Sequence, residues 1–202
     1  MYPYFIIEWK KSKVDIREKT RYTDRMKRER KEREMELMAK RVVELLIGKK
    51  FHISFAESCT GGLAAARLVE VPDASKVFDA GFVTYANEAK VNYLGVLPES
   101  IAKYGVVSEE VAGQMAVGAA KKNSANVGVG ISGIAGPSGG TREKPIGMVC
   151  FGFYVNGVLT TKTKSFGEIG RNMVREASVE FVYRTLEELL AGKISGEILE
   201  GR

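Results

Sequence analysis

The sequence predicts an α/β protein, a three-layer α/β/α sandwich built on a mixed, mostly parallel sheet. From residue 51 onward, short apolar segments typical of strands alternate with segments whose apolar residues recur at helical spacing. This alternation indicates parallel strands joined by helices, whereas the Asn156-Gly157 dipeptide between two strand-like segments indicates one antiparallel hairpin. The 202 residues are 45% hydrophobic and 28% charged, which is ordinary for a globular domain with its own core.

The first half of the domain contains two predicted strands, each followed by a helix. A glycine pair after the first strand opens its helix, and Asn87 is expected to cap the helix after the second strand. The predicted elements are a core-facing helix over 35–48, a strand over 51–56, a helix over 64–69, a strand over Phe78–Tyr85 and a short helix from Asn87.

The second half begins with a helix capped by Ser108 and ending at Lys121 or Lys122. Its first turn is acidic, which the helix dipole favours. The remaining predicted elements are a buried strand over 126–132, hairpin strands over 147–155 and 158–166, and a last helix over about 170–190.

The net charge of +6 is concentrated in the first quarter of the chain. Residues 1–50 carry 16 Lys and Arg against 9 Asp and Glu, whereas residues 51–202 carry 15 against 16. From Lys10 to Glu34 the two signs alternate with almost no apolar stripe, which is typical of a solvent-exposed helix. Because a nucleic-acid-binding arm needs clustered charge of one sign or interleaved aromatics, we do not expect a nucleic-acid partner.

The chain is therefore expected to have three parts. These are a basic helical extension over 1–34, a folded domain over 35–192 and a tail over 193–202. Met26 and Met35 are alternative starts, which would make the extension a gene-boundary artefact.

Cysteine and hydropathy patterns exclude several classes of protein. Cys59 and Cys150 cannot form a disulfide framework, and with one histidine in the chain they cannot form a Cys/His zinc site, so no metal is expected. No apolar run reaches the ~18 residues that a membrane span needs. The opening Tyr2–Ile7 run lacks the basic lead-in of a signal peptide. We therefore expect a cytoplasmic protein with no membrane partner.

The first candidate site is the segment Ala56–Gly62, which reads AESCTGG between a predicted strand and a predicted helix. Such a turn presents backbone N–H groups and a positive dipole end, so it attracts an anion or a developing oxyanion. Ser58 and Thr60 supply hydroxyls there, or they simply cap the helix. Cys59 is a further candidate nucleophile, but its histidine partner would have to be His52, which we expect to be structural.

The second candidate site is the segment 81–90, GFVTYANEAK, a strand running into a capped helix. With Asn87 as the cap, Lys90 occupies the third helical position, from which its amine can lean toward the strand end beside the first segment. A partly desolvated lysine at the positive end of a helix has a lowered pKa and can act as a base. The alternative is a solvent-facing lysine on a surface helix.

The third candidate site is the glycine-rich segment 130–145. The segment contains five glycines, begins within a predicted buried strand and ends beside Arg142 and Lys144. Glycines let backbone amides approach a phosphate closely, and the cations add charge. Its position at a strand end, where open α/β sheets bind ligands, favours a phosphate-binding loop over a plain flexible one.

Four motifs, in this order and spacing, closely resemble the C-terminal domain of the CinA (competence/damage-inducible) family: AESCTGG, GFVTYANEAK, GVVSEEVA and GISGIAGPSGG-T-x-x-KP-x-G. Stand-alone members of that family are nicotinamide-nucleotide deamidases. The resemblance covers about residues 35–190 and implies an α/β/α sandwich, usually dimeric. It implies hydrolysis of the carboxamide of nicotinamide mononucleotide to nicotinate mononucleotide and ammonia, with neither metal nor cofactor.

The sequence departs from this family in two places. The basic arm stands where the family usually has a larger N-terminal domain related to molybdopterin-binding proteins. Near Gly167 the chain reads FGEIGRNMVR, where relatives tend to have a shorter F-x-G-D-R-x-x-V-R.

On this resemblance, Ser58 is the expected nucleophile and Lys90 the expected base, with Tyr85 orienting or relaying the proton. An alternative for the same reaction has Lys90 and Tyr85 activating water while Ser58 positions the substrate. The backbone amides of Thr60, Gly61 and Gly62 are expected to cradle the oxyanion or phosphate. The residues expected to hold the nucleotide are Gly133, Ala135, Gly136, Gly140, Thr141, Lys144 and Arg171.

Two other classes of function stay open. One is a non-catalytic nucleotide-binding module, which the presence of Ser58, Tyr85 and Lys90 argues against. The other is a nucleic-acid-associated protein acting through the basic arm.

Overall fold

The computed structural model describes residues 16–193 and 197–198. Residues 1–15, 194–196 and 199–202, which include the Tyr2–Ile7 run and much of the expected tail, lie outside the described residues. The chain divides into two compact units, Met1–Glu34 and Met35–Arg202. Within the described part of the chain, no helix is long and apolar enough to cross a membrane.

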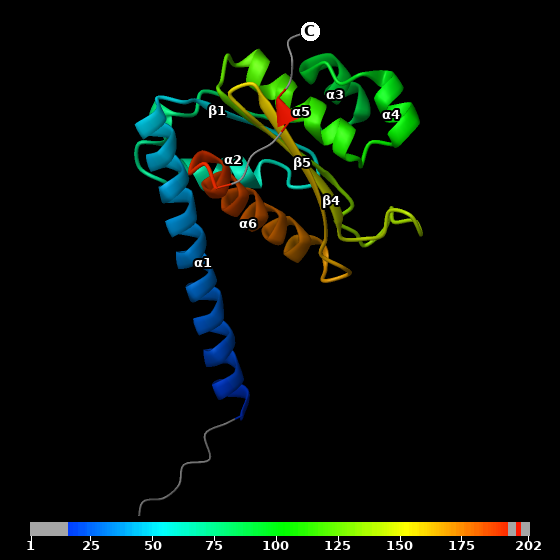
Figure 1. Cartoon of the computed structure of the whole chain (residues 1–202). Coiled ribbons are helices and arrows are strands. Elements are labelled where there is room, and N and C mark those ends of the chain that lie inside the picture. The colour runs from blue at the N-terminus through cyan, green and yellow to red at the C-terminus, as the bar shows by residue number, and fades with distance from the viewer. Residues whose placement is uncertain (1–15, 194–196, 199–202) are drawn as a thin grey trace, which may run out of the picture. The chain divides into compact units, whose positions relative to one another are not determined.

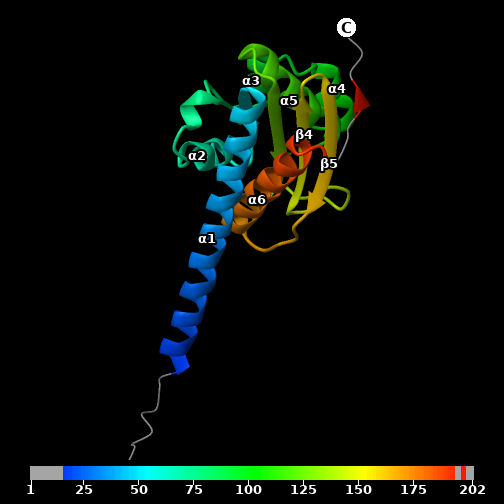
Figure 2. The same cartoon turned by 60° about the vertical axis from the view of Figure 1, so that its left-hand side comes forward.

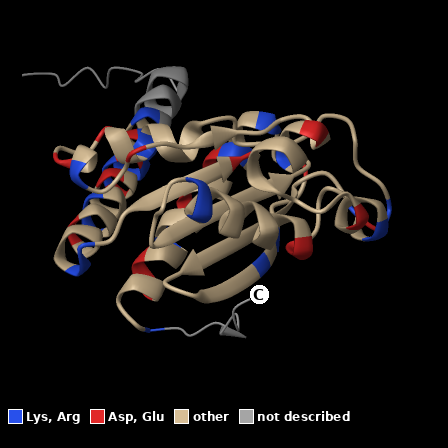
Figure 3. Ribbon diagram, turned by 90° about the horizontal axis from the view of Figure 1, so that it is seen from above, with Lys and Arg blue, Asp and Glu red and all other residues tan. Residues whose placement is uncertain are grey.

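The first unit contains the beginning of helix α1 (Ile16–Lys49). Basic and acidic residues are intermixed along the described part of this helix (Figure 3). Salt bridges join residues four apart, with 2.8 Å between Arg25 Nε and Glu29 Oε1 and 2.9 Å between Arg30 Nε and Glu34 Oε1. These pairs lie at the exposed positions that the alternating charges predict.

Within the described residues, the second unit is built on a six-stranded mixed sheet of order β2-β1-β3-β4-β5-β6. The strands are β1 (Ile53–Glu57), β2 (Phe82–Val83), β3 (Val127–Gly133), β4 (Met148–Val155), β5 (Val158–Ser165) and β6 (Glu197–Ile198). β1 pairs in parallel with β2 and β3, whereas the pairs β3-β4, β4-β5 and β5-β6 are antiparallel. β5 therefore runs in the same direction as β1, β2 and β3, and the predicted mixed, mostly parallel sheet is confirmed.

Helices cover both faces of this sheet, which confirms the three-layer sandwich. The helices after α1 are α2 (Leu63–Val69), α3 (Asn87–Leu94), α4 (Pro98–Tyr104), α5 (Glu109–Lys122) and α6 (Arg171–Leu190), with a short 3₁₀ helix at Ala74–Lys76. α3, α4 and α5 lie on one face, and α2, α6 and residues 35–49 of α1 lie on the other (Figures 1 and 2). The larger apolar core fills the second face.

Glycines in β3 bring α5 close to the sheet. The alternating residues Val127, Val129 and Ile131 belong to the larger core, so the glycines between them face α5. A Cβ added at Gly128 or Gly130 would overlap backbone atoms of α5. Since only glycine leaves this space open, these two residues set the distance between α5 and the sheet.

The predicted second strand is largely wrong. Of Phe78–Tyr85, only β2 forms a strand, with one further bridge from Phe78 to Ile53. The cause lies in side chains far away in sequence, because Ser54 Oγ and Asn123 Nδ2 both donate to the Ala80 carbonyl, each at 3.0 Å. These bonds hold the segment before β2 out of strand pairing.

Other element predictions differ in detail. Ala86, not Asn87, is the N-cap of α3, and no side chain caps that helix. Lys90 is therefore the fourth helical residue rather than the third.

α4 was not predicted, although Pro98 at its start is a recognised signal for a first helical turn. The Ser108 cap is confirmed, since its hydroxyl accepts from the Val111 amide at 3.3 Å. The hairpin is confirmed too, with φ of 47° at Asn156 and 95° at Gly157.

Candidate active site

One edge of the sheet gathers the three candidate segments. Ser58 directly follows β1, the segment before α3 follows β2, and the glycine-rich loop follows β3. Because β1, β2, β3 and β5 run in one direction, the loops after them emerge at the same edge. The first turn of α6, which follows β5, joins them there.

Lys90 and Ser58 lie next to each other in this site. The Lys90 Nζ is 3.3 Å from Ser58 Oγ, 2.8 Å from the Thr84 carbonyl oxygen and 3.3 Å from the Tyr85 carbonyl oxygen. Ser58 is held by its own backbone, whose N–H donates to the Ile131 carbonyl on β3 at 3.0 Å. The expected meeting of a hydroxyl and an amine is therefore present.

Lys90 is buried without a countercharge. Only 1% of the residue is exposed, and among the described residues it forms no salt bridge. Burial lowers the pKa of its amine below the ordinary 10.5, and this effect outweighs the opposing attraction from Cys59 and Glu88. The solvent-facing alternative for this lysine is therefore wrong.

The buried carboxylate of Glu57 occupies the N-terminus of α2. Its Oε2 accepts from the amides of Gly62 and Ala64, both at 3.0 Å, and its Oε1 accepts from the amide of Ala65 at 2.9 Å. Glu57 is 1% exposed and is the last residue of β1, immediately before Ser58. It thereby fixes the turn that carries Ser58 against the start of α2.

The expected amide cradle at this turn needs correction at Gly61 and Gly62, whereas the part expected of the Thr60 amide stays a prediction. The Gly62 amide donates to Glu57, and the Gly61 amide donates to the Ser58 carbonyl at 3.1 Å, so neither is available to an oxyanion or phosphate. Thr60 is fully buried, and its hydroxyl has no hydrogen-bond partner among the described residues. The motif AESCTGG does not show that the carboxylate of its own Glu57 accepts hydrogen bonds from the amides at the start of the helix. The sequence therefore did not predict that these amides are occupied.

The cysteine-histidine alternative has no support in the geometry. Burial raises the pKa of the Cys59 thiol to about 12, so it stays protonated and is a poor nucleophile near neutral pH. His52 lies at the other end of β1, where its Nδ1 is 2.7 Å from Asp79 Oδ2.

Tyr85 and Arg171 join two of the candidate segments. The Tyr85 hydroxyl is 2.9 Å from Arg171 Nη2, and Arg171 Nη1 donates to the Gly136 carbonyl at 2.9 Å. It is thus the Tyr85 carbonyl, and not its hydroxyl, that contacts Lys90, so the expected proton relay through the Tyr85 hydroxyl is not supported. Arg171 lies within the site despite the altered sequence around Gly167.

Arg175, one turn further along α6, is a site residue that the sequence reasoning missed. Its Nη2 and Nε donate to the Thr60 carbonyl at 2.9 Å and 3.3 Å, and its Nη1 donates to Asn172. Among the described residues, neither Arg175 nor Arg171 forms a salt bridge with a carboxylate. The signal that could have found it is the final arginine of the NMVR motif, one helical turn after Arg171.

The far end of the glycine-rich loop serves the fold. Lys144 Nζ donates to the carbonyls of Tyr104 and Val107, at 2.5 Å and 2.6 Å. The Thr141 hydroxyl accepts from the Lys144 amide at 3.1 Å, which closes a turn. The expectation that Lys144 binds a phosphate therefore needs correction, because its ammonium has partners within the chain. The Thr141 hydroxyl is exposed and acts here only as an acceptor, so its expected contact with a phosphate stays a prediction.

The other expected residues of this loop are placed by packing. A Cβ at Gly133 would lie 2.6 Å from Val149 Cγ2, and one at Gly140 would lie 2.8 Å from the Ile146 nitrogen. Ala135 is 4% exposed and belongs to the core. Gly136 is the member of this loop that contacts Arg171, so it connects the loop to the site.

A family model for the CinA C-terminal domain matches residues 35–190, the part of the chain that carries every element of this site. The chain belongs to the CinA C-terminal domain family. Solved CinA-family structures have the same fold. The competence/damage inducible protein CihA of Agrobacterium tumefaciens superposes with a TM-score of 0.74 at 42% identity, covering 79% of this chain and 96% of that one. A CinA-superfamily protein of Klebsiella pneumoniae gives 0.75 at 35% identity, covering 78% and 98%.

Longer CinA relatives contain this domain as one part. A CinA-like protein of Kosmotoga olearia is 48% identical over 153 residues, which are 74% of this chain and 37% of the relative. A relative from Alkaliphilus oremlandii, named for competence and damage induction, is 51% identical over 140 residues, 69% of this chain and 34% of the relative. The chain thus spans about a third of the length of these relatives.

Proposed function

We propose that this CinA-family domain is an amidohydrolase that converts nicotinamide mononucleotide to nicotinate mononucleotide and ammonia. The observation that carries the proposal is the buried Lys90 amine, 3.3 Å from Ser58 Oγ and without a salt bridge among the described residues. The choice of a pyridine nucleotide as substrate rests on the family resemblance. Arg171 and Arg175 of α6, which form no salt bridge among the described residues, support an anionic substrate.

The surroundings of Lys90 support its role as a base toward Ser58. A neutral amine has two N–H donors and one lone pair. The carbonyls of Thr84 and Tyr85 can only accept, so they take the two N–H groups. The lone pair is then left for the proton of Ser58, the one neighbour of the three that can donate. Because Lys90 is enclosed while Ser58 is half-buried, these contacts favour serine over lysine-activated water as the nucleophile.

The proposed reaction proceeds through an acyl-enzyme. Ser58 Oγ attacks the carboxamide carbon as its proton passes to Lys90, and the electron pair of the C=O bond moves to the oxygen. The Lys90 ammonium offsets the charge of this oxyanion and then gives its proton to the nitrogen, which leaves as ammonia when the C–N bond breaks. Water then attacks the ester and gives a proton to Lys90. The C–Oγ bond breaks and Ser58 takes its proton back from Lys90, and the carboxylic acid loses its remaining proton to the released ammonia or to solvent and leaves as the carboxylate.

The two arginines of α6 are the proposed contacts for the phosphate. Arg171 and Arg175 donate only to carbonyl, hydroxyl and amide oxygens, so their charge is not neutralised by a neighbouring carboxylate among the described residues. Guanidinium groups bind phosphate with strong, charge-assisted hydrogen bonds. Glu57 already occupies the amides at the start of α2, so we assign the phosphate to the start of α6.

The test is ammonia release from nicotinamide mononucleotide, with the nicotinate product identified by mass spectrometry. Nicotinamide riboside and nicotinamide are the comparison substrates, and both are expected to react poorly because they lack the phosphate. Ser58→Ala should abolish turnover yet still bind the mononucleotide, whereas Ser75→Ala, at an exposed serine outside the site, should behave like the wild type. Absence of ammonia from all three compounds would refute the proposal. Near-normal turnover by Ser58→Ala would refute serine as the nucleophile.

A further inference from the structure

The Lys90 amine is open to a reacting molecule on one side. Two of the three positions around its nitrogen are occupied by the carbonyl oxygens of Thr84 and Tyr85, and the Ser58 hydroxyl occupies the third. Lys90 is fully buried, whereas Ser58 is only half-buried. A molecule that exchanges a proton with Lys90 must therefore approach it from the side of Ser58.

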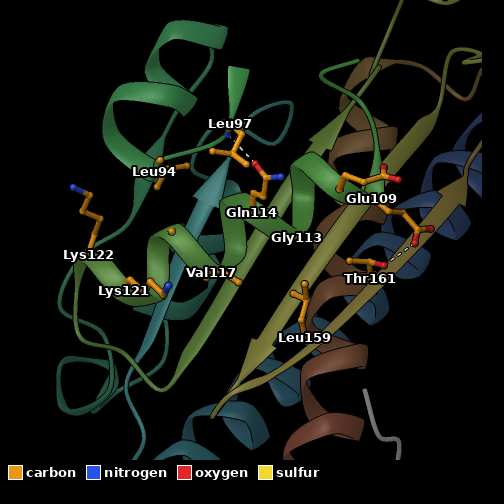
Figure 4. A pocket seen from close by; sticks show the side chains of 13 residues that line it. Leu94, Leu97, Glu109, Gly113, Gln114, Val117, Lys121, Lys122, Leu159 and Thr161 are labelled. Carbon is orange, nitrogen blue, oxygen red and sulfur yellow. Dashed lines mark hydrogen bonds between the residues drawn. The ribbon is translucent and has the colours of Figure 1, made fainter. Parts of the chain in front are cut away.

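A groove beside α3 does not open a second route to this amine. The groove has a volume of about 1090 Å³, follows the outer side of α5 and passes Leu94, which lies one helical turn after Lys90 (Figure 4). Neither Lys90 nor Ser58 lines the groove. The groove is thus separate from the reacting groups, and both halves of the proposed reaction use the same open side of Lys90.

Lys90 is also the acid-base side chain that contacts Ser58 Oγ in the part of the chain that the structure describes. The Tyr85 hydroxyl is hydrogen-bonded to Arg171 instead, and His52 lies at the other end of β1 beside Asp79. When the ester on Ser58 breaks down, the incoming nucleophile therefore has one group to which it can give its proton. This group does not distinguish water from another small molecule that carries a proton and a lone pair.

The position from which ammonia leaves must also admit a nucleophile. In the proposed reaction ammonia departs with a proton from Lys90, and water then enters and gives a proton to Lys90. By microscopic reversibility, the position that releases ammonia also accepts ammonia. Hydroxylamine is ammonia with one hydroxyl group added, and it is uncharged near neutral pH. It therefore has both the size and the lone pair that this position requires.

We propose that this site has a second activity, transfer of the acyl group to small uncharged amines, which rests on the proposed function. The amine nitrogen attacks the carbonyl carbon of the Ser58 ester as one of its protons passes to Lys90. The C–Oγ bond then breaks and Ser58 takes that proton from Lys90. The product is an N-substituted amide, which is a hydroxamate when the amine is hydroxylamine.

The charge of the site determines which amines react. Arg171 and Arg175 are cationic, and neither forms a salt bridge with a carboxylate within residues 16–193 and 197–198. A protonated amine has no lone pair for the attack, and these arginines repel its positive charge. Methylamine is protonated near neutral pH, so it is excluded at the pH at which hydroxylamine reacts.

The experiment incubates the full-length protein with nicotinamide mononucleotide and increasing concentrations of hydroxylamine at neutral pH. Mass spectrometry measures the hydroxamate and nicotinate mononucleotide, and ammonia is measured in parallel. The ratio of hydroxamate to nicotinate mononucleotide should rise in proportion to the hydroxylamine concentration, because hydroxylamine and water compete for one ester. Ammonia should equal the sum of the two products, since each acyl-enzyme releases one ammonia as it forms.

Three controls accompany this measurement. Ser58→Ala should form no more hydroxamate than a sample without protein, whereas Ser75→Ala, at an exposed serine outside the site, should behave like the wild type. Methylamine at the same concentrations should give no N-methyl amide. Nicotinate mononucleotide incubated with hydroxylamine and the protein should give no hydroxamate, because the acyl group comes from the amide.

The outcomes separate this inference from the deamidase proposal. Ammonia and nicotinate mononucleotide without hydroxamate at every hydroxylamine concentration would overturn acyl transfer and leave deamidation standing. Equal yields from methylamine and hydroxylamine would overturn the selection of uncharged amines. Absence of ammonia with and without hydroxylamine would refute the proposed function, and acyl transfer with it. The wild-type measurement decides even if Ser58→Ala fails to fold.

Discussion

Replacing Lys90 with methionine separates the chemical role of this residue from its effect on stability. Methionine keeps the apolar stem and removes the amine, so the proposed base is lost. General-base catalysis contributes about 10²–10⁴-fold to a rate, and turnover should fall by that amount. Lys90→Arg should be nearly as damaging, because a guanidinium stays protonated and cannot take the proton of Ser58.

The same substitution should change how stability depends on pH. In the folded protein, burial holds the Lys90 pKa below the ordinary 10.5, so between these two values the unfolded chain binds more protons than the folded one. The free energy of unfolding of the wild type therefore gains a term that rises with pH across this window and levels off above 10.5. Each unit of pKa depression is worth about 1.4 kcal/mol. Lys90→Met lacks this term.

Lys90→Met also has a destabilising effect, which opposes the stability gained by removing a buried charge. The buried Thr84 carbonyl loses its donor, which costs about 1–3 kcal/mol at every pH. The stability difference between wild type and Lys90→Met should therefore favour methionine most on the low-pH side of the window and shift toward the wild type as the pH rises.

Urea denaturation at several pH values, from neutral to alkaline, measures this difference. Lys76→Met, at an exposed lysine paired with Asp73, is the control and should show a much smaller pH dependence. A difference that stays constant with pH would contradict the burial-induced pKa shift. Retained turnover in Lys90→Arg would contradict the base assignment and leave the lysine as a charge that holds substrate.

Three further outcomes are expected. Gly118→Ala should lower the free energy of unfolding by about 1–3 kcal/mol in a urea titration, since the added methyl overlaps the backbone of α3. Gly48→Ala has open space around the added methyl and should raise the free energy of unfolding by about 0.5–1 kcal/mol in the same titration. Arg171→Ala should raise KM for the mononucleotide by about tenfold or more, because a charged hydrogen bond contributes about 1.5–3 kcal/mol, while Arg184→Ala at the exposed other end of α6 leaves KM unchanged in the ammonia assay. Lys144→Met should lower Tm with little change in KM, and a large KM increase at unchanged Tm would restore Lys144 to the phosphate site.

Local patterns determined much of the fold. The spacing of apolar residues predicts the long helices, and the Asn156-Gly157 dipeptide predicts the hairpin turn, because each depends on residues close together in the chain. The order of these elements predicts the three-layer sandwich. The resemblance of four motifs to one family predicts that Ser58 and Lys90 act together, and in the structure their side chains are in contact.

Only the tertiary structure decided which polar groups remain available for chemistry. The Glu57 carboxylate accepts from amides at the start of α2, and the Lys144 ammonium donates to the Val107 carbonyl. The glycine amides of the first turn and the Lys144 ammonium, both expected to bind substrate, therefore stabilise the fold instead. Arg175 enters the site from a helix more than a hundred residues after Thr60. The same limit explains the short second strand, where Asn123 captures the Ala80 carbonyl. A sequence motif indicates which polar groups are present. Which donor pairs with which acceptor depends on the groups that folding brings close together, and these are often far apart in the chain.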